Sequence, residues 1–68
     1  MKVVIFGASK GIGLETVRRA LEAGYQVRAF ARTATTIPDE HPNLEKMDGD
    51  ARDPQAVRAA IGPDDVVI

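Results

Sequence analysis

The hydrophobic pattern of the chain alternates between short apolar runs and a longer stretch with helical spacing. The first run predicts a strand over residues 2–6, buried on both faces of a parallel sheet. Residues 11–23 place apolar side chains at helical spacing, which predicts a helix with one buried side. Gly24 is expected to end this helix in the left-handed conformation, and residues 26–31 to form a second strand. The apolar stripe of the predicted helix comprises Ile12, Leu14, Val17, Ala20 and Leu21.

A polar interruption follows the second predicted strand. Residues 32–42 are rich in polar side chains and broken by prolines, so we predict a loop there. His41, the one histidine of the chain, falls in this loop without the partners that a metal site or a proton relay would need. A short third strand is expected over residues 44–47, and its weaker apolar character favours a position near the edge of the sheet.

The last part of the chain predicts a second helix and a fourth strand. Asp53 followed by Pro54 is a typical helix start, with a capping side chain and a proline at the first helical position. Gly62 and the proline after it are expected to end the helix, and residues 66–68 to form the strand. The predicted apolar face of this helix comprises Val57, Ala60 and Ile61.

The resulting order of strand, helix, strand, loop, strand, helix, strand indicates the α/β class with a parallel sheet. We predict the strand order 3-2-1-4, which is that of the first four strands of a doubly wound, Rossmann-type sheet. Strands five and six of such a sheet have no counterpart here, so we expect a truncated half-domain. Strand four would then lie beside strand one and leave its other edge bare.

Composition narrows the classes of function. The chain has 68 residues, a net charge of −1 and no cysteine. It shows no basic surplus for nucleic acid, no apolar stretch of about 20 residues for a membrane helix, and no secretory leader. We therefore expect a cytoplasmic protein that binds neither nucleic acid nor membrane.

A glycine-rich loop directly follows the first predicted strand. Gly7 would let the chain leave the strand in a tight turn, Gly11 would let the backbone approach a pyrophosphate, and Gly13 would let the helix pack closely. The free N–H groups at the start of the next helix form an anion site. The spacing is G-x-x-x-G-x-G, and the candidate cofactor-binding residues are Gly7, Ser9, Lys10, Gly11, Ile12 and Gly13.

Charges near the end of the second strand favour NADP over NAD. Sites for NAD often carry an acid there that binds the adenosine ribose, but no acid lies between Glu22 and Asp39. Arg32 stands at this position instead and could bond a ribose 2′-phosphate through two N–H groups. Lys10 in the glycine loop could add a second positive charge. Arg28 lies toward the opposite end of the strand and is not expected in the site.

The end of the third strand offers a candidate for adenine recognition. Asp50 could accept a hydrogen bond from the adenine amino group, with Ala51 contributing backbone atoms. The alternative is that aspartate and glycine serve only the turn at this point, as they often do. We expect Asp48 to belong to the turn alone.

Three segments resemble the short-chain dehydrogenase/reductase superfamily. The glycine loop is similar to the cofactor loop of these enzymes. The run Asp48-Gly49-Asp50-Ala51-Arg52-Asp53-Pro54 resembles the G-D-x-x-D-P segment of extended and atypical members, including the NAD(P)H-binding, NmrA-like branch. Residues 62–68 resemble their fourth strand. The resemblance implies that residues 1–68 are the N-terminal dinucleotide-binding part of a Rossmann domain, with Gly7, Gly11, Ile12 and Gly13 at the pyrophosphate, Arg32 at the 2′-phosphate and Asp50 at the adenine.

The catalytic residues of this superfamily have no match in the chain. Its serine and Tyr-x-x-x-Lys motif lie beyond the fourth strand, and Tyr25 is followed four positions later by Ala29. We therefore expect the NADP(H)-binding portion of an oxidoreductase that is inactive alone. Two alternatives remain open. The chain could belong to a non-catalytic NAD(P)H sensor, or it could be a structural unit that forms a homo-oligomer through the bare edge of strand four.

Overall fold

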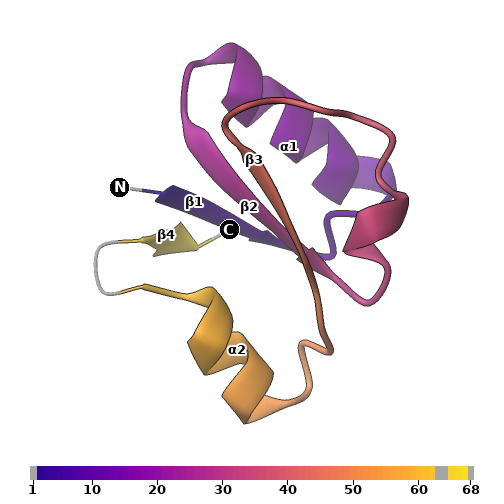
Figure 1. Cartoon of the computed structure of the whole chain (residues 1–68), viewed down its shortest axis with the longest axis vertical. Helices are drawn as coiled ribbons and strands as arrows, with labels where there is room; N and C mark the ends of the chain where they lie inside the picture. Colours follow the sequence, from indigo (N-terminus) through magenta and orange to yellow (C-terminus); the bar gives the residue numbers. More distant parts are fainter. Residues whose placement is uncertain (1, 63–64, 68) are drawn as a thin grey trace.

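The computed structural model describes residues 2–62 and 65–67. Its elements in chain order are β1 (Lys2–Phe6), α1 (Gly11–Glu22), β2 (Gln26–Ala31), the 3₁₀ turn η1 (Ala34–Thr36), β3 (Leu44–Asp48), α2 (Pro54–Ala60) and β4 (Val66–Val67). The four strands form one parallel sheet in the order β3-β2-β1-β4 (Figure 1). The predicted α/β class, Rossmann-type sheet and strand order are confirmed.

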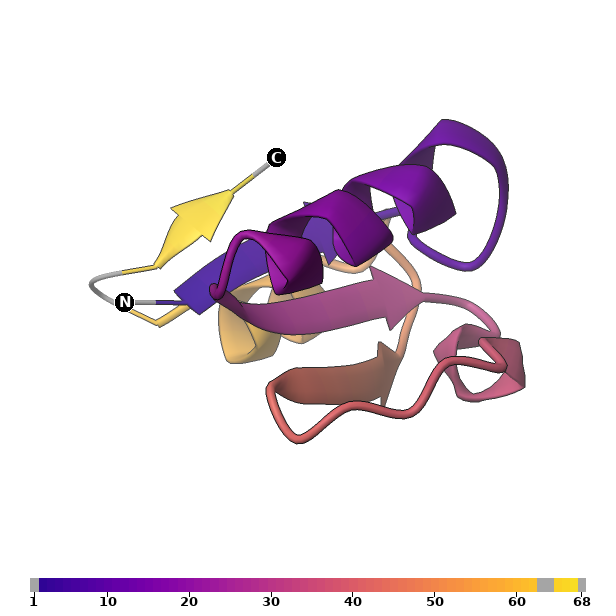
Figure 2. The same ribbon diagram turned by 90° about the horizontal axis from the view of Figure 1, so that it is seen from above.

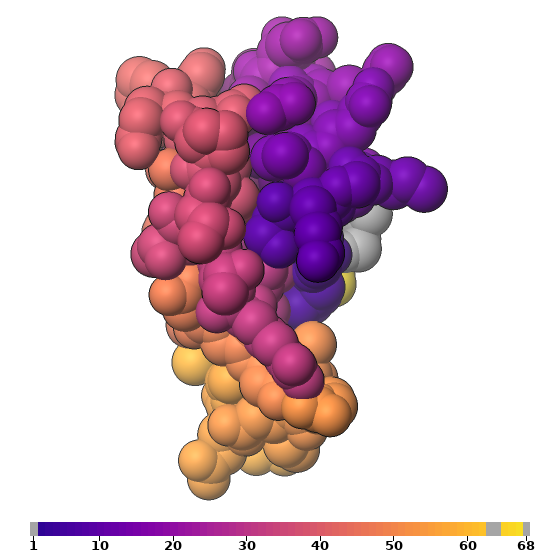
Figure 3. Space-filling model, turned by 90° about the vertical axis from the view of Figure 1, so that its right-hand side faces the viewer, coloured from indigo at the N-terminus to yellow at the C-terminus, as the bar shows by residue number. Residues whose placement is uncertain are grey.

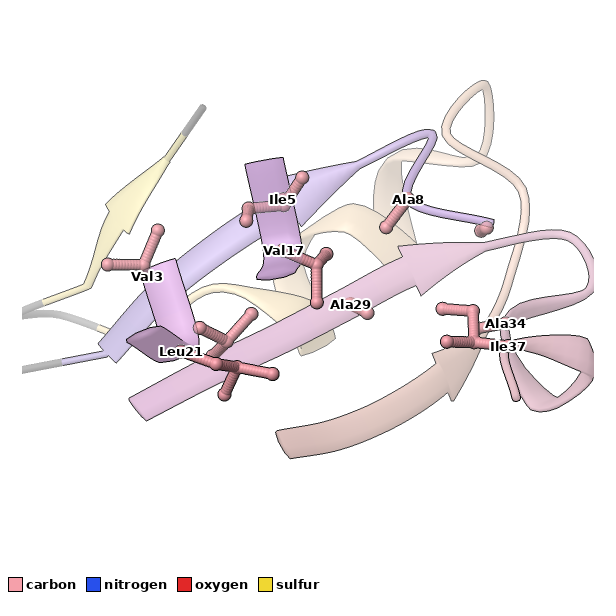
Figure 4. Close-up of a cluster of buried hydrophobic side chains, with 10 residues drawn as sticks. Val3, Ile5, Ala8, Val17, Leu21, Ala29, Ala34 and Ile37 are labelled. Atoms are coloured by element: carbon pink, nitrogen blue, oxygen red, sulfur yellow. The ribbon is translucent and has the colours of Figure 1, made fainter. Parts of the chain in front are cut away.

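The helix α1 covers one face of the sheet, and α2 lies on the other (Figures 1 and 2). Alternate strand residues face α1, where Val17 and Leu21 pack over Val3, Ile5 and Ala29 (Figure 4). All five of these side chains are buried. The α1 face thus holds a continuous aliphatic core, which also takes in Ala8, Val27, Ala31, Ala34 and Ile37.

The α2 face combines large buried side chains with charged groups. Val4 and Phe30 are fully buried, and the rings of Phe6 and Phe30 meet edge to face with centroids 5.1 Å apart. Ala60 is the buried residue of α2. Arg28 in β2 donates hydrogen bonds to Glu45 of β3 and to the carbonyl oxygen of Ala60, and its Nη1 lies 3.6 Å from Asp65 Oδ2. We call Arg28, Glu45, Asp65 and the Ala60 carbonyl the Arg28 cluster.

Capping hydrogen bonds mark the end of α1 and the start of α2. Gly24 has φ +90°, and two bonds, from Gly24 N–H to Leu21 and from Tyr25 N–H to Ala20, close the end of α1. The left-handed role of Gly24 is confirmed, although the helix ends one residue before the predicted 11–23. At α2, Asp53 accepts a hydrogen bond from the Gln55 N–H at 3.0 Å, which confirms the predicted start.

The segment 32–42 is more ordered than predicted. It contains η1, and Ala34 and Ile37 are almost completely buried against the core. Asp48 is the last residue of β3 rather than part of the turn alone, and its carboxylate accepts hydrogen bonds from the N–H and hydroxyl of Thr35. The interpretation of 32–42 as a plain polar loop was therefore wrong in this respect, because two apolar residues three positions apart pin it to the sheet.

The two edges of the sheet are β3 and β4. The predicted edge position of the third strand is confirmed, as is the pairing of the fourth with the first. The valines of β4 are close to half exposed, and the predicted residue 68 of that strand lies outside the described residues, as does the proline expected to end α2. Assembly of two copies through the β4 edge stays a prediction. In residues 2–62 and 65–67, no helix has the length and apolar character needed to cross a bilayer.

Candidate functional site

The carboxyl ends of β1, β2 and β3 enclose a hollow of about 460 Å³. Figure 3 faces this edge, where the indigo loop after β1, the magenta segment after β2 and the orange segment after β3 reach the surface together. We call it the carboxyl-edge hollow. Six of the nine predicted site residues line it, namely Gly7, Ser9, Lys10, Arg32, Asp50 and Ala51. Its other lining residues are Phe30, Ala31, Thr33, Gly49 and Arg52.

The turn after β1 depends on its glycines for two different reasons. Gly7 and Gly11 have φ of +67° and +64°, a region that side chains with a Cβ rarely adopt. Gly13 instead has an ordinary backbone, but a Cβ there would collide with the carbonyl group of Gly7. The first turn of α1 therefore lies directly against the loop, and the N–H of Gly7 is bonded to Phe30 O at 2.9 Å.

The start of α1 presents unpaired donors next to the hollow. Lys10 occupies the N-cap, and its ammonium group cannot accept hydrogen bonds from the N–H groups of the first turn. That turn contains no acidic residue, so the positive end of the helix dipole is not offset locally. This arrangement can bind an anion such as a phosphate.

Ile12 differs from its prediction as a member of the buried stripe of α1. Its side chain is 88% exposed. Gly11 and Ile12 line a separate shallow hollow on α1 together with Glu15, Thr16 and Arg19. The stripe prediction was wrong for Ile12, while its role near a pyrophosphate stays a prediction.

Phe30 is a buried residue at the lining of the carboxyl-edge hollow, and its ring explains the glycine at position 49. A Cβ on Gly49 would lie 2.6 Å from the Phe30 ring, so the chain after β3 can cross the ring only with a glycine at this point. The N–H of Gly49 bonds the carbonyl oxygen of Ala31 at 2.9 Å. These contacts bring the residues after β3 next to Arg32, which follows β2.

Asp50 is held by a neighbour that the sequence analysis did not single out. Its Oδ1 accepts the backbone N–H of Arg52 at 2.8 Å, and Nε and Nη2 of Arg52 bond its two oxygens at 3.0–3.3 Å. Arg32 Nη2 lies 3.8 Å from Asp50 Oδ2. Hydrogen bonds from the side chain and backbone of Arg52, with a smaller contribution from the charge of Arg32, lower the pKa of Asp50 to about 2.

Arg52 is thus the main site residue that sequence reasoning missed. The available signal was local, since an aspartate often bonds the backbone two residues further on. That signal places the backbone of residue 52 but not the direction of its side chain. Phe30 was missed because it reads as a core residue, and it serves both the core and the hollow.

Arg28 and His41, which were not expected in the site, are not among the residues that line the hollow. Arg28 belongs to the cluster on the α2 face. The Nδ1 of His41 accepts a hydrogen bond from the N–H of Asn43 at 3.0 Å, within the loop where it was predicted. Across the part of the chain that the structure describes, no three histidine or acidic side chains gather as metal ligands would.

Comparison with known proteins identifies the family of the chain. Residues 7–68 match the model of a family described as NAD(P)H-binding. An uncharacterized oxidoreductase of Schizosaccharomyces pombe is 41% identical over 87% of this chain and 20% of its own length. A probable short-chain type dehydrogenase/reductase of Helicobacter pylori is 45% identical over 81% of this chain and 21% of its own.

A third relative is a 3 beta-hydroxysteroid dehydrogenase/Delta 5→4-isomerase of Mycobacterium tuberculosis, 32% identical over 97% of this chain and 18% of its own length. The chain therefore spans about a fifth of the length of the curated relatives it matches. These relatives confirm the resemblance to the short-chain dehydrogenases/reductases.

Proposed function

The chain belongs to the NAD(P)H-binding family, and on that premise we propose that it prefers NADP(H) to NAD(H) at the carboxyl-edge hollow. The observation that carries this proposal is the position of Arg32. It follows β2 at the rim of the same hollow that Lys10 lines from the glycine loop. Arg32 is 67% exposed at its side chain, so its guanidinium can reach a ligand phosphate.

The donor groups of the hollow suit the phosphates of a dinucleotide. We assign the pyrophosphate to the loop and first turn of α1, where a Cβ on Gly13 would meet Gly7. The residues of this subsite are Gly7, Ser9, Lys10, Gly11, Ile12 and Gly13. When bound, the nicotinamide would supply hydride chemistry, and this chain would contribute binding and orientation.

The adenosine end of the dinucleotide would lie between the ends of β2 and β3. We assign the 2′-phosphate to Arg32 and Lys10, because two cations at one rim favour the extra charge of NADP. Asp50 and the backbone of Ala51 are the polar groups on the adenine side. The carboxylate of Asp50 already accepts several hydrogen bonds from Arg52, so an adenine amino group would have to share it.

The names of the relatives and the sequence itself support a proposal for the role of the chain in a reaction. Three relatives carry names of oxidoreductases or dehydrogenases. Tyr25 has no lysine four positions later, so the chain holds no Tyr-x-x-x-Lys motif for proton transfer. We infer that residues 1–68 supply cofactor binding to an oxidoreductase of the atypical, NmrA-like kind and turn over no carbonyl substrate alone.

Calorimetric titration with NADPH and NADH tests the cofactor preference. In Arg32→Ala, NADPH binding should weaken roughly 10- to 100-fold, the usual size for a hydrogen bond to a charged group, while NADH binding changes little. Arg58→Ala is a matched control, since it removes the same charge from an exposed position in the last turn of α2. Equal affinities for the two dinucleotides in the unmodified chain would refute the preference.

A further inference from the structure

Three charged side chains meet at the rim of the carboxyl-edge hollow, and they are not equivalent. Asp50 Oδ2 lies 3.8 Å from Arg32 Nη2 and 3.0 Å from Arg52 Nη2. Arg52 bonds both carboxylate oxygens and adds a bond from its backbone N–H. Arg32 makes a single approach of 3.8 Å, beyond hydrogen-bond distance.

The asymmetry follows from chain connectivity. Arg52 lies two residues after Asp50, so the turn between them holds its backbone N–H in place and brings its side chain alongside. Arg32 comes from a different strand end and has a largely exposed side chain. Arg52 is therefore the main hydrogen-bond partner of the carboxylate, whereas Arg32 lines the hollow and approaches the carboxylate only at 3.8 Å.

We propose that Arg52 is a positioning residue for cofactor preference, which occupies the Asp50 carboxylate so that Arg32 stays available for the 2′-phosphate. This inference rests on the proposed function, in which Arg32 binds that phosphate. A carboxylate beside a phosphate site repels the ligand and competes for the nearby arginine. The charge and hydrogen bonds of Arg52 counter both effects.

The expected signature is a change in the ratio of the NADH and NADPH dissociation constants. In Arg52→Ala, the Asp50 carboxylate should pair with Arg32 in competition with the 2′-phosphate and lower this ratio about fivefold, the upper range for one exposed ion pair. Adenine is common to both ligands, so any direct effect of Asp50 on adenine cancels in the ratio.

A double variant separates positioning from direct contact. In Asp50→Asn with Arg52→Ala, the competing carboxylate is gone, so the ratio should return to within about twofold of the unmodified chain. Arg58→Ala controls for net charge, and circular dichroism verifies that each variant is folded. Arg52 is 77% exposed at its side chain, so its truncation leaves the core intact.

Three outcomes would overturn the inference, and they differ from one another. If Arg52→Ala weakens both dinucleotides equally, Arg52 contacts a part that they share. If the ratio falls and the double variant does not restore it, Arg52 contacts the phosphate itself. If Arg32→Ala leaves the ratio unchanged, the proposed preference fails together with the inference.

Discussion

The two faces of the sheet are stabilised in different ways. On the α1 face, many small and medium aliphatic side chains are buried together. They come from β1, β2, α1 and the segment around η1. On the α2 face, burial is concentrated in Val4 and Phe30, and Arg28 of β2 is bonded to the Glu45 carboxylate of β3 and to the Ala60 backbone carbonyl of α2. The helix on the aliphatic face is also the longer one, since α1 has 12 residues and α2 has seven.

This difference indicates how single substitutions should act on each face. A distributed aliphatic core loses a small part of its contacts when one side chain is shortened. A face that depends on one aromatic ring and one ionic cluster loses much more at those positions and little elsewhere. The three predictions below test this contrast.

The largest effect is expected for Phe30→Ala. Removal of a fully buried ring should lower the free energy of unfolding by about 3–5 kcal/mol, whereas Val17→Ala on the α1 face should cost about 2 kcal/mol. Urea denaturation followed by circular dichroism measures both. Tyr25→Ala is the aromatic control, since Tyr25 is 47% exposed. Equal losses for Phe30→Ala and Val17→Ala would contradict the contrast between the faces.

A smaller effect is expected for Arg28→Met, which removes the centre of the Arg28 cluster and keeps an apolar stem. The carboxylate of Asp65 is 13% exposed and would lose its nearby cation, so we expect a loss of about 1–2 kcal/mol in the same denaturation assay. Arg19→Met is the control, because the pair of Arg19 with Glu15 is well exposed. A loss of stability no larger than that of the control would show that the Arg28 cluster does not stabilise the α2 face.

The smallest expected effect is the loss of stability at low pH that comes from protonation of Glu45. Hydrogen bonds from Arg28 and then Lys2 lower the pKa of Glu45 below its ordinary value of 4.5. The ionised form is therefore favoured by folding, and its contribution is present above that value and is lost as the pH falls through the lowered pKa. Because Glu45 is half exposed, we expect less than about 1 kcal/mol.

Denaturation midpoints from neutral to acidic pH, compared between the unmodified chain and Glu45→Gln, measure this contribution. The unmodified chain should lose more stability on acidification than the variant does. Identical pH profiles would show that the ionisation of Glu45 has no influence on folding.

The features that could be predicted from the sequence are those with local causes. Continuous apolar runs, Gly24 after a helix and Asp53 before one act through their own backbone and neighbours, and each was found where expected. Ile12 failed because it lies five positions before Val17. At 100° per residue this places it about 140° around the helix from the buried side.

Long-range partners could not be predicted in this way. The periodicity of β2 shows that Arg28 shares a face with Phe30, but not that Glu45 and Asp65 will surround it. The pair of Asp50 and Arg52 is a local case by contrast, because the two residues lie two positions apart, and there the sequence indicated the turn but not the direction of the Arg52 side chain. Which charged side chains pair depends on how the strands and helices are arranged in space. The spacing of apolar residues along the chain does not predict these pairs.

The close approach of Gly13 to the carbonyl of Gly7 has a kinetic consequence. The loop between β1 and α1 is set on one side by this contact and on the other by the hydrogen bond to Phe30. Because both contacts exist without a ligand, binding at the loop requires no prior rearrangement of its backbone. The association rate constant of an anionic ligand should then follow diffusion and electrostatic attraction, and it should fall as ionic strength rises.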